Sequence, residues 1–326
     1  MTPPNTVLKA VESTLRDIAG QPVRIRNTAS VGGGCINPSA RLEAEGGGTY
    51  FLKWNASAHV EMFAAEADGL RALARPGTVR VPEILGWGGS GCLEDPGWLL
   101  MEHIPQGAPM AEFGERLGVG MGLLHNSVLH EPDPPHSFSA NPIQDPVLIT
   151  AGPFGWRRNN FIGSLPQGNE PGEDWPTFWR DKRLEPQIRM ARDNGHFQGA
   201  RGQLLDQLLE KSEDIMAGTE EDGPALLHGD LWTGNYYSGP AGDPVLIDPA
   251  VYVGAGEVDL AMMELFGSLP AGFEEGYGSI RKLAPEYAAF RRDLYQVYYL
   301  LVHVNLFGSS YVSGTLGAAR RALAGS

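Results

Sequence analysis

Two short motifs constrain this chain more than any other feature, because they place two aspartates and an asparagine at the ends of apolar segments. The first motif spans residues 226–235 (LLHGDLWTGN) and the second spans residues 245–249 (VLIDP). A carboxylate five residues before an amide, followed by a second carboxylate after an apolar strand, provides one base for a hydroxyl group and two oxygen ligands for Mg²⁺. We therefore predict phosphoryl-transfer chemistry, with Asp230 as the base and Asn235 and Asp248 as the metal ligands.

Each part of these motifs also has a simpler explanation when it is taken alone. Residues 228–230 (HGD) would suit a turn, Asn235 would suit a loop cap, and Asp248 before a proline would suit the end of a strand. The order, the spacing and the apolar flanks together favour the catalytic interpretation, because a motif gains weight from its context.

A glycine cluster upstream is a candidate phosphate-binding loop. Gly32, Gly33 and Gly34 lie between two segments with strand-like sequence, residues 23–26 and 49–54. Glycines allow backbone amides to approach phosphate oxygens closely, so we expect this loop to contact ATP. The cluster is not a G-x-G-x-x-G motif, and a flexible turn is the alternative.

A lysine and a glutamate complete the expected nucleotide site. Lys53 lies near the end of the second strand, and Glu66 follows thirteen residues later on a predicted helix. We expect Glu66 to pair with Lys53 and to position its ammonium on the α- and β-phosphates. Glu61 is the competitor, but Glu66 lies nearer the apolar face of that helix.

The chain is long enough, at 326 residues of which 42% are hydrophobic, to form two lobes. We place the boundary after an apolar strand, which gives a nucleotide-binding lobe at residues 1–104 and a largely helical catalytic lobe at residues 105–326. Between them, Met101, Glu102 and Ile104 form a connection whose backbone can offer the Glu102 carbonyl and the Ile104 amide to adenine. An ordinary strand end would have the same residue types.

Apolar periodicity predicts an α+β protein. We expect a long surface loop at residues 131–153, and glycines in one predicted helix, residues 113–125, suggest close packing of that helix. Helices are expected at residues 7–18, 59–73, 113–125, 204–216, 258–266 and 288–306, and strands at residues 23–26, 49–54, 98–102 and 245–247.

Charge and cysteine content exclude several classes of protein. The net charge of −14 argues against nucleic-acid binding, which requires clustered Lys and Arg. We find no apolar run long enough to span a membrane and no signal peptide, and two cysteines are too few for a disulfide framework. We therefore expect a soluble cytoplasmic protein that does not contact membranes.

The sequence resembles the fructosamine kinase (ketosamine-3-kinase) family, within the aminoglycoside phosphotransferase and choline kinase-like group. The matching segments are residues 226–235 with their tryptophan, 154–155 (FG), 174–179 (DWPTFW) and 303–308 (HVNLFG). This resemblance implies a two-lobed protein-kinase-like fold that uses ATP and Mg²⁺. It also implies phosphorylation of a fructosamine, ribulosamine or erythrulosamine on the sugar O3 hydroxyl, which destabilises the sugar–amine adduct and permits deglycation.

Three further residues are assigned with alternatives left open. Trp232 would form an apolar wall against the sugar or the amine substituent, a role that the resemblance favours over a place in the core. Two features depart from the family pattern and leave the exact sugar open: Asp259, where the family commonly has Glu, and the segment 156–160. We assign Asp259 to the substrate site. Cys35, inside the glycine loop, is either an unreactive small residue or a redox switch that links two chains, so both monomer and dimer are open.

Two other functions compete with ketosamine phosphorylation. One is another small-molecule kinase of the same group, acting on an aminoglycoside, choline or homoserine. The other is a nucleotide-binding pseudokinase without turnover. The presence of Asp230 together with Lys53, Glu66, Asn235 and Asp248 argues against a pseudokinase, because a scaffold does not need a base.

Overall fold

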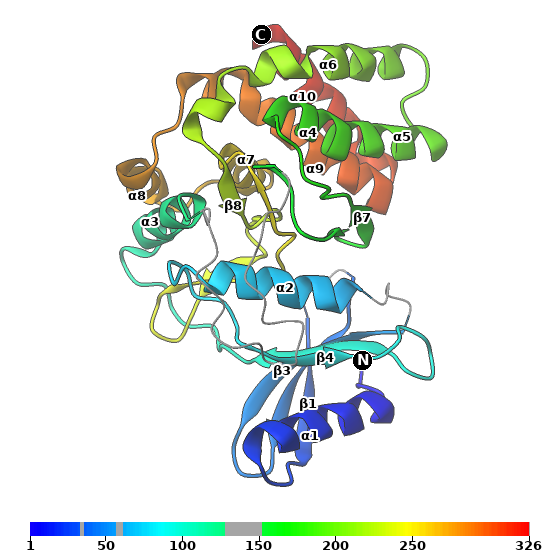
Figure 1. The fold of residues 1–326 in the computed structure, drawn as a ribbon, viewed down its shortest axis with the longest axis vertical. Helices are drawn as coiled ribbons and strands as arrows, with labels where there is room; N and C mark the ends of the chain where they lie inside the picture. The colour runs from blue at the N-terminus through cyan, green and yellow to red at the C-terminus, as the bar shows by residue number, and fades with distance from the viewer. Residues whose placement is uncertain (33–35, 57–60, 128–151, 326) are drawn as a thin grey trace. The chain divides into compact units, whose positions relative to one another are not determined.

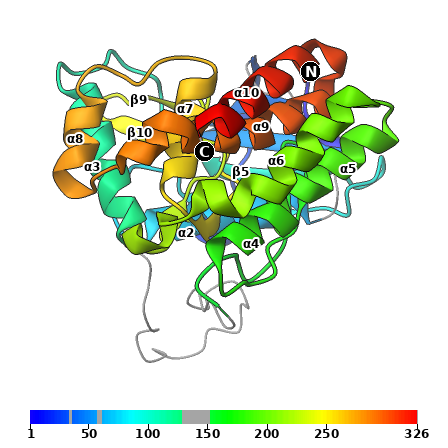
Figure 2. The same cartoon turned by 90° about the horizontal axis from the view of Figure 1, so that it is seen from above.

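The computed structural model describes all residues except 33–35, 57–60, 128–151 and 326 (Figures 1 and 2). The chain divides into two compact units, one formed by Met1–Ala111 with Tyr236–Asp248 and the other by Glu112–Asn235 with Pro249–Ser326. The expected division after residue 104 therefore differs from this one in two ways. The first unit extends to residue 111, and it also takes in a later hairpin that carries one of the expected metal ligands.

The first unit is built on a five-stranded antiparallel sheet with the order β1-β2-β3-β5-β4. Strand β2 was not predicted, although its residues alternate between apolar and charged side chains, because the alternation is short and two of its three apolar residues are alanines, which are depleted in strands. The strands are β1 (Ile25–Val31), β2 (Ser39–Ala44), β3 (Thr49–Asn55), β4 (Ile84–Gly88) and β5 (Gly97–Glu102).

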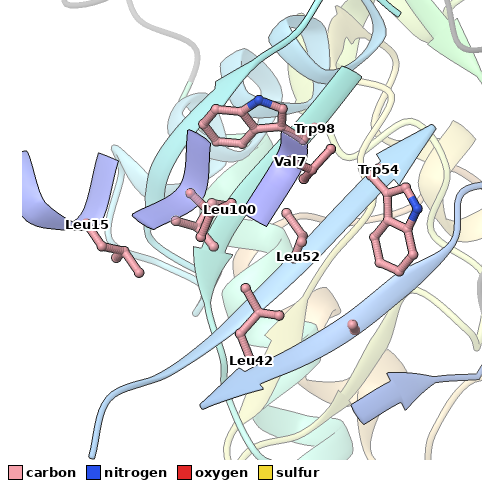
Figure 3. Packing of buried hydrophobic residues seen from close by; sticks show 9 residues of the cluster. Val7, Leu15, Leu42, Leu52, Trp54, Trp98 and Leu100 are labelled. Carbon is pink, nitrogen blue, oxygen red and sulfur yellow. The ribbon is translucent and has the colours of Figure 1, made fainter. Parts of the chain in front are cut away.

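Helix α1 (Asn5–Ala19) packs its apolar face on this sheet and forms the core of the first unit (Figure 3). The predicted helix is confirmed, and it ends at Gly20, whose φ of +67° favours glycine. The cluster consists of buried aliphatic and tryptophan side chains from α1, β2, β3 and β5: Val7, Val11, Leu15, Ala40, Leu42, Leu52, Trp54, Trp98 and Leu100.

The alternation of β3 places its lysine on the side opposite this core. Leu52 and Trp54 belong to the cluster under α1, so the intervening Lys53 points to the other face of the sheet. That face carries α2 (Met62–Ala74), and Figure 1 shows α1 and α2 on opposite sides of the sheet. The sheet thereby directs Lys53 toward the helix that bears Glu66.

A short hairpin from later in the chain joins the first unit. It consists of β9 (Tyr236–Ser238) and β10 (Pro244–Leu246). The amide of Leu246 donates to the carbonyl of Arg80 (2.9 Å), and the amide of Gly107 donates to the carbonyl of Ser238 (2.9 Å). These bonds explain why residues 236–248 group with the first unit although they follow the HGD motif in sequence.

The second unit is mainly helical. Figures 1 and 2 both show α9 (Arg292–Phe307) beside α10 (Val312–Gly325). Its other helices of eight or more residues are α3 (Phe113–His125), α5 (Glu185–Asp193), α6 (Ala200–Met216), α7 (Glu257–Leu265) and α8 (Phe273–Ile280), and the short helix α4 spans Trp175–Trp179. No described helix is long and apolar enough to cross a membrane.

The glycines of α3 allow this helix to lie very close to α8. A Cβ atom at Gly114 would come within 2.1 Å of the Ala271 carbonyl oxygen, and one at Gly118 within 2.2 Å of the Phe273 carbonyl oxygen. The close packing expected from these glycines is confirmed. The two helices α3 and α8 therefore pack as a close pair.

One short two-stranded ladder holds the segment that carries the HGD motif, and a second such ladder belongs to the same unit. Strand β8 (Ala225–Leu227) pairs with β11 (Tyr252–Gly254), and β6 (Asn160–Ile162) pairs with β7 (Leu165–Gln167). The amide of Ala250 also donates to the carbonyl of His228 (2.9 Å). The loop after β8 is therefore anchored at its first residue.

Candidate active site

In the first unit, a buried lysine lies between two carboxylates. Lys53 Nζ is 2.7 Å from Glu66 Oε1 and also forms a short ion pair with Asp248 Oδ1. The side chains of Lys53 and Glu66 are each only 10% exposed. Glu61, the competing partner, is exposed at the start of α2. The ion pair expected between Lys53 and Glu66 is thus present, and Asp248 shares the same ammonium.

Electrostatics keep this lysine charged. Burial alone would lower the pKa of Lys53, but the carboxylates of Asp248 and Glu66 outweigh burial and raise that pKa above its usual value. Burial raises the pKa of Glu66, and the adjacent ammonium opposes that increase. A cation held in this way at neutral pH is suited to bind phosphate oxygens.

Asp248 follows β10 with a backbone conformation that is uncommon for a non-glycine residue. Its φ is +58°, and besides Phe197 it is the only described non-glycine residue with a positive φ. Such strain is retained where the surrounding structure imposes it, and it often occurs at functional sites. The hairpin bonds to Arg80 and Gly107 and the ion pair to Lys53 constrain the segment that ends at Asp248.

In the second unit, the loop after β8 brings the expected base next to the expected amide. Asn235 Nδ2 donates to the Asp230 carbonyl oxygen (2.8 Å) and to Asp230 Oδ2 (3.2 Å). The backbone N–H of Asn235 also donates to the backbone carbonyl of Trp232 (2.9 Å), which closes the loop. Asp230 is half-buried, whereas Asn235 is buried. Since the amide nitrogen is engaged with Asp230, Oδ1 is the Asn235 atom with the chemistry to bind a metal ion.

Asp259 supports this loop from beneath, and its position corrects our assignment of it to the substrate site. Its side chain is fully buried, at 0% exposure. Its carboxylate accepts the backbone amides of His228 (2.7 Å) and Gly229 (2.8 Å). The third contact is His125 Nε2, which lies 3.2 Å from Oδ2. A carboxylate enclosed in this way cannot touch a sugar, so we reinterpret Asp259 as a residue that positions the loop.

Two more residues of this support were missed from the sequence. His125 on α3 is buried, which lowers its pKa, and its Nδ1 lies 2.9 Å from the hydroxyl of Tyr277 on α8. Because the carboxylate of Asp259 only accepts, Nε2 of the neutral ring donates to it and Nδ1 accepts from Tyr277. Asp259 itself left a signal in the sequence, an aspartate in the otherwise apolar start of the predicted helix 258–266, whereas His125 and Tyr277 left none.

Helix α9 also contacts the loop. The hydroxyl of Tyr299 donates to the carbonyl of Gly229 (2.9 Å). Gly229 itself has a φ of +81°, and a Cβ atom there would come within 2.2 Å of the Ala250 carbonyl oxygen. The HGD motif therefore requires glycine at this position for both conformation and space.

The ring of Trp232 is half-buried and lies over the backbone of Gly234. A Cβ atom at Gly234 would approach the indole to 2.4 Å, so the glycine leaves room for the ring. This packing accounts for both residues in the LWTGN part of the motif. A contact between Trp232 and substrate remains a proposal.

Side-chain interactions hold the segment from Glu102 to Ile104 at the end of β5. Glu102 accepts a hydrogen bond from the amide of Glu83 (3.2 Å) and forms an ion pair with Arg80, and the hydroxyl of Tyr237 donates to the carbonyl of Ile104 (3.0 Å). Met101 is buried in β5 between β3 and β4. Adenine binding by the backbone of Glu102 and Ile104 is still a prediction.

Part of the expected phosphate loop lies outside the described residues. This applies to Gly33, Gly34 and Cys35 and to the redox role considered for Cys35. Gly32 is described and exposed, and a Cβ atom there would meet no other atom within 4 Å.

Comparison with known proteins decides the family. The model of the fructosamine kinase family matches residues 7–324. The chain belongs to the fructosamine kinase family. It is 36% identical to a Synechocystis protein named "probable ketoamine kinase" over 305 residues, which cover 93% of this chain and 92% of that protein. It is 34% identical to the protein-ribulosamine 3-kinase of Arabidopsis thaliana, covering 91% and 82% of the two chains.

The structure of this chain matches the crystal structure of a fructosamine-3-kinase-like protein of Thermobifida fusca. The TM-score is 0.79 and the two sequences are 30% identical. The match covers 97% of this chain and 99% of that one. The expected α+β protein-kinase-like fold is confirmed, with an antiparallel sheet and helices in the first unit and a mainly helical second unit. The resemblance drawn from the sequence motifs is confirmed as well.

The support beneath the catalytic loop generates a testable prediction. In an Asp259→Asn variant, one of the two backbone amides of His228 and Gly229 would face an NH₂ group and lose its acceptor. A buried donor without a partner costs about 1–3 kcal/mol, and small shifts of a catalytic group cost up to about 100-fold in rate. We expect a lower melting temperature and a fall in kcat of about 10- to 100-fold, with the Kd for ATP little changed.

Calorimetry, steady-state kinetics and ATP titration would measure these three quantities. The control is Asp193→Asn, which changes an exposed aspartate on α5 and should alter none of them. Wild-type kcat in Asp259→Asn would contradict the positioning role.

Proposed function

We propose that this protein is an ATP-dependent ketosamine kinase that transfers the γ-phosphoryl group of ATP to the O3 hydroxyl of a ketosamine. The observation that carries the proposal is the arrangement of Asp230 and Asn235 in one loop, supported from below by Asp259. A half-buried carboxylate with a fixed orientation suits a general base that takes a proton from an alcohol.

The proposed transfer step involves one base and one displacement. The O3 oxygen attacks the γ-phosphorus, and its proton passes to the carboxylate of Asp230. The new O3–phosphorus bond forms as the bond between the γ-phosphorus and the bridging oxygen of ADP breaks. The Asn235 amide, through its hydrogen bond to Oδ2, holds the carboxylate in one orientation during this step.

Lys53 is the proposed contact for the ATP phosphates. Its ion pair with Glu66 holds the ammonium away from bulk water, and its raised pKa keeps it charged. A lysine held in this way binds the phosphates through its positive charge and orients them. The protein forms no covalent bond to the phosphoryl group. Backbone contacts of Glu102 and Ile104 to adenine are proposed as the second part of the nucleotide site.

Asn235 and Asp248 are the proposed magnesium ligands, each chosen for the chemistry of its donor atom. Both offer the hard oxygen ligands that Mg²⁺ prefers, and the positive φ of Asp248 supports a functional role for this position. When bound, the ion would neutralise charge on the phosphates. Lys53 already compensates part of the Asp248 charge.

The acceptor is proposed from the family. Two relatives carry names that specify a ketoamine or a protein-bound ribulosamine as substrate and, for the plant protein, the 3 position as the site of phosphorylation. Fructosamines, ribulosamines and erythrulosamines share the ketose carbon and the O3 hydroxyl. Trp232, half-buried beside the base, is the proposed ring against which the sugar lies.

The base generates a prediction that separates binding from chemistry. We expect Asp230→Asn to bind ATP like the wild type but to lose at least about 100-fold in kcat, because the amide cannot accept the hydroxyl proton. Nucleotide titration and steady-state turnover measure the two effects, with Asp193→Asn as the control. Turnover close to that of the wild type would remove Asp230 from this role.

A panel of acceptors tests the substrate class. Purified protein with Mg²⁺ and ATP is offered a fructosamine, a ribulosamine, an erythrulosamine, an aminoglycoside, choline and homoserine, and ADP release is followed. We expect kcat/KM for at least one ketosamine to exceed that for the other alcohols by more than about tenfold. Preferential use of an aminoglycoside or choline would contradict the proposal, and ATP binding without transfer to any acceptor would indicate a pseudokinase.

A further inference from the structure

Four aromatic rings gather on the second unit at the end of α7, on α9 and just after it. We call them the ring patch: Phe266, His303, Phe307 and Tyr311. Phe266 is 41% exposed and Phe307 is 50% exposed, although both are large hydrophobic residues. Exposed aromatic side chains that cluster rather than scatter often mark a binding surface.

The rings contact one another around the imidazole. The His303 centroid lies 4.7 Å from that of Phe266, 5.6 Å from that of Phe307 and 4.9 Å from that of Tyr311. The three interplanar angles are between 50° and 54°, so the rings are tilted and do not stack flat. Phe266 and Phe307 keep part of their rings exposed to solvent in this arrangement.

The tautomer of His303 follows from its one hydrogen bond in the structure. Nδ1 lies 2.8 Å from the carbonyl oxygen of Tyr299, and a carbonyl can only accept, so Nδ1 carries the proton. Burial lowers the pKa of His303, which keeps the ring neutral at pH 7. Nε2 is then an acceptor, and no described residue donates to it. The ring patch thus combines aromatic faces with the Nε2 acceptor of His303.

Two connections join the ring patch to the catalytic loop. Gly267, which follows Phe266, lies so close to the loop that a Cβ atom there would be 3.0 Å from Cγ2 of Thr233. Thr233 lies between Asp230 and Asn235 in sequence. On α9, Tyr299 bonds to the Gly229 carbonyl, and His303 lies one helical turn further along the same face.

We propose that the ring patch binds the amine side of the ketosamine, which is the protonated amine together with the lysine or other chain attached to it. This assignment rests on the proposed function and adds the part of the substrate that lies beyond the sugar. The amine is attached to C1, two carbons from the C3 hydroxyl that reacts. Whatever the amine carries must therefore lie beside the catalytic loop, where the ring patch is located.

The chemistry of the ring patch fits a protonated secondary amine. His303 Nε2 accepts one N–H, the face of Phe266, which is the nearer ring to the imidazole, attracts the positive charge, and the face of Phe307 covers the methylene chain. In contrast, the neighbouring Asn305 is committed to structure, because its Nδ2 donates to Oε1 of Gln187 (2.7 Å) and to the Gln187 carbonyl (3.0 Å). Two polar residues of the HVNLFG segment thus have different roles.

Comparing KM for two ketosamines with the same sugar distinguishes binding of the chain attached to the amine from binding of the sugar. One is formed with ammonia and the other with the side chain of Nα-acetyl-lysine, so that only the second carries a chain. We expect Phe307→Ala to raise KM for the lysine-derived ketosamine roughly fivefold to tenfold, because the ring that covers one or two methylene groups of the attached chain is lost. KM for the ammonia-derived ketosamine, kcat and the KM for ATP should stay within about twofold of the wild type.

His303→Asn tests the acceptor separately. The asparagine amide retains a donor near the position of Nδ1 but removes the acceptor at Nε2. Because both ketosamines carry a protonated amine, we expect KM to rise roughly fivefold for both of them. The control is Leu123→Ala, which truncates a side chain on α3 with the same 41% exposure as Phe266 and should change neither KM.

The outcomes distinguish this inference from the proposed function. An equal effect of Phe307→Ala on both ketosamines, or no effect on either, would overturn the assignment of the attached chain to the ring patch. Unchanged KM values in His303→Asn would overturn the role of the imidazole. If the wild type phosphorylated neither ketosamine but did phosphorylate another alcohol, the proposed function itself would fail, and this assignment with it.

Discussion

The buried carboxylate of Asp259 is the interaction on which the second unit depends. It accepts two successive backbone amides, those of His228 and Gly229, and it is in turn bonded to His125 on α3. A buried charge is tolerated only when its hydrogen bonds are satisfied, and here the donors belong to the loop that carries the base. The helices α3, α7 and α8 therefore determine, through one side chain and the His125–Tyr277 pair, where Asp230 lies.

The first unit uses the same principle with the opposite charge. The ammonium of Lys53 is buried between Glu66 and Asp248, which lie on α2 and at the end of the late hairpin. Side chains alternate along β3, so Leu52 faces α1 in the hydrophobic core (Figure 3) and the next residue, Lys53, faces α2. A shift of the strand by one residue would break both the core packing and the ion pair. The first unit thus positions its polar residues through packing that the strand pattern encodes, whereas the second unit does so through a buried carboxylate.

Sequence reasoning succeeded where periodicity or spacing was long enough to carry information. Helix α1 with its terminal Gly20, helix α3 with its close glycines and the loop from Asp230 to Asn235 were all predictable. The three-residue strands β8 and β11 were missed, because so few residues show no periodicity. The role of Asp259 was misassigned, since its partners are backbone amides that leave no trace in residue types. The His125–Tyr277 bond joins residues far apart in sequence and has no local signal.

The position of the transferred phosphate tests the central claim most directly. A ketosamine labelled with ¹³C in its sugar is incubated with the protein, Mg²⁺ and ATP, and the product is examined by ¹³C and ³¹P NMR. The account predicts one phosphate per sugar, with phosphorus coupling to C3 and its neighbours C2 and C4. Phosphate on another oxygen of the sugar, or on the amine side of the substrate, would contradict it.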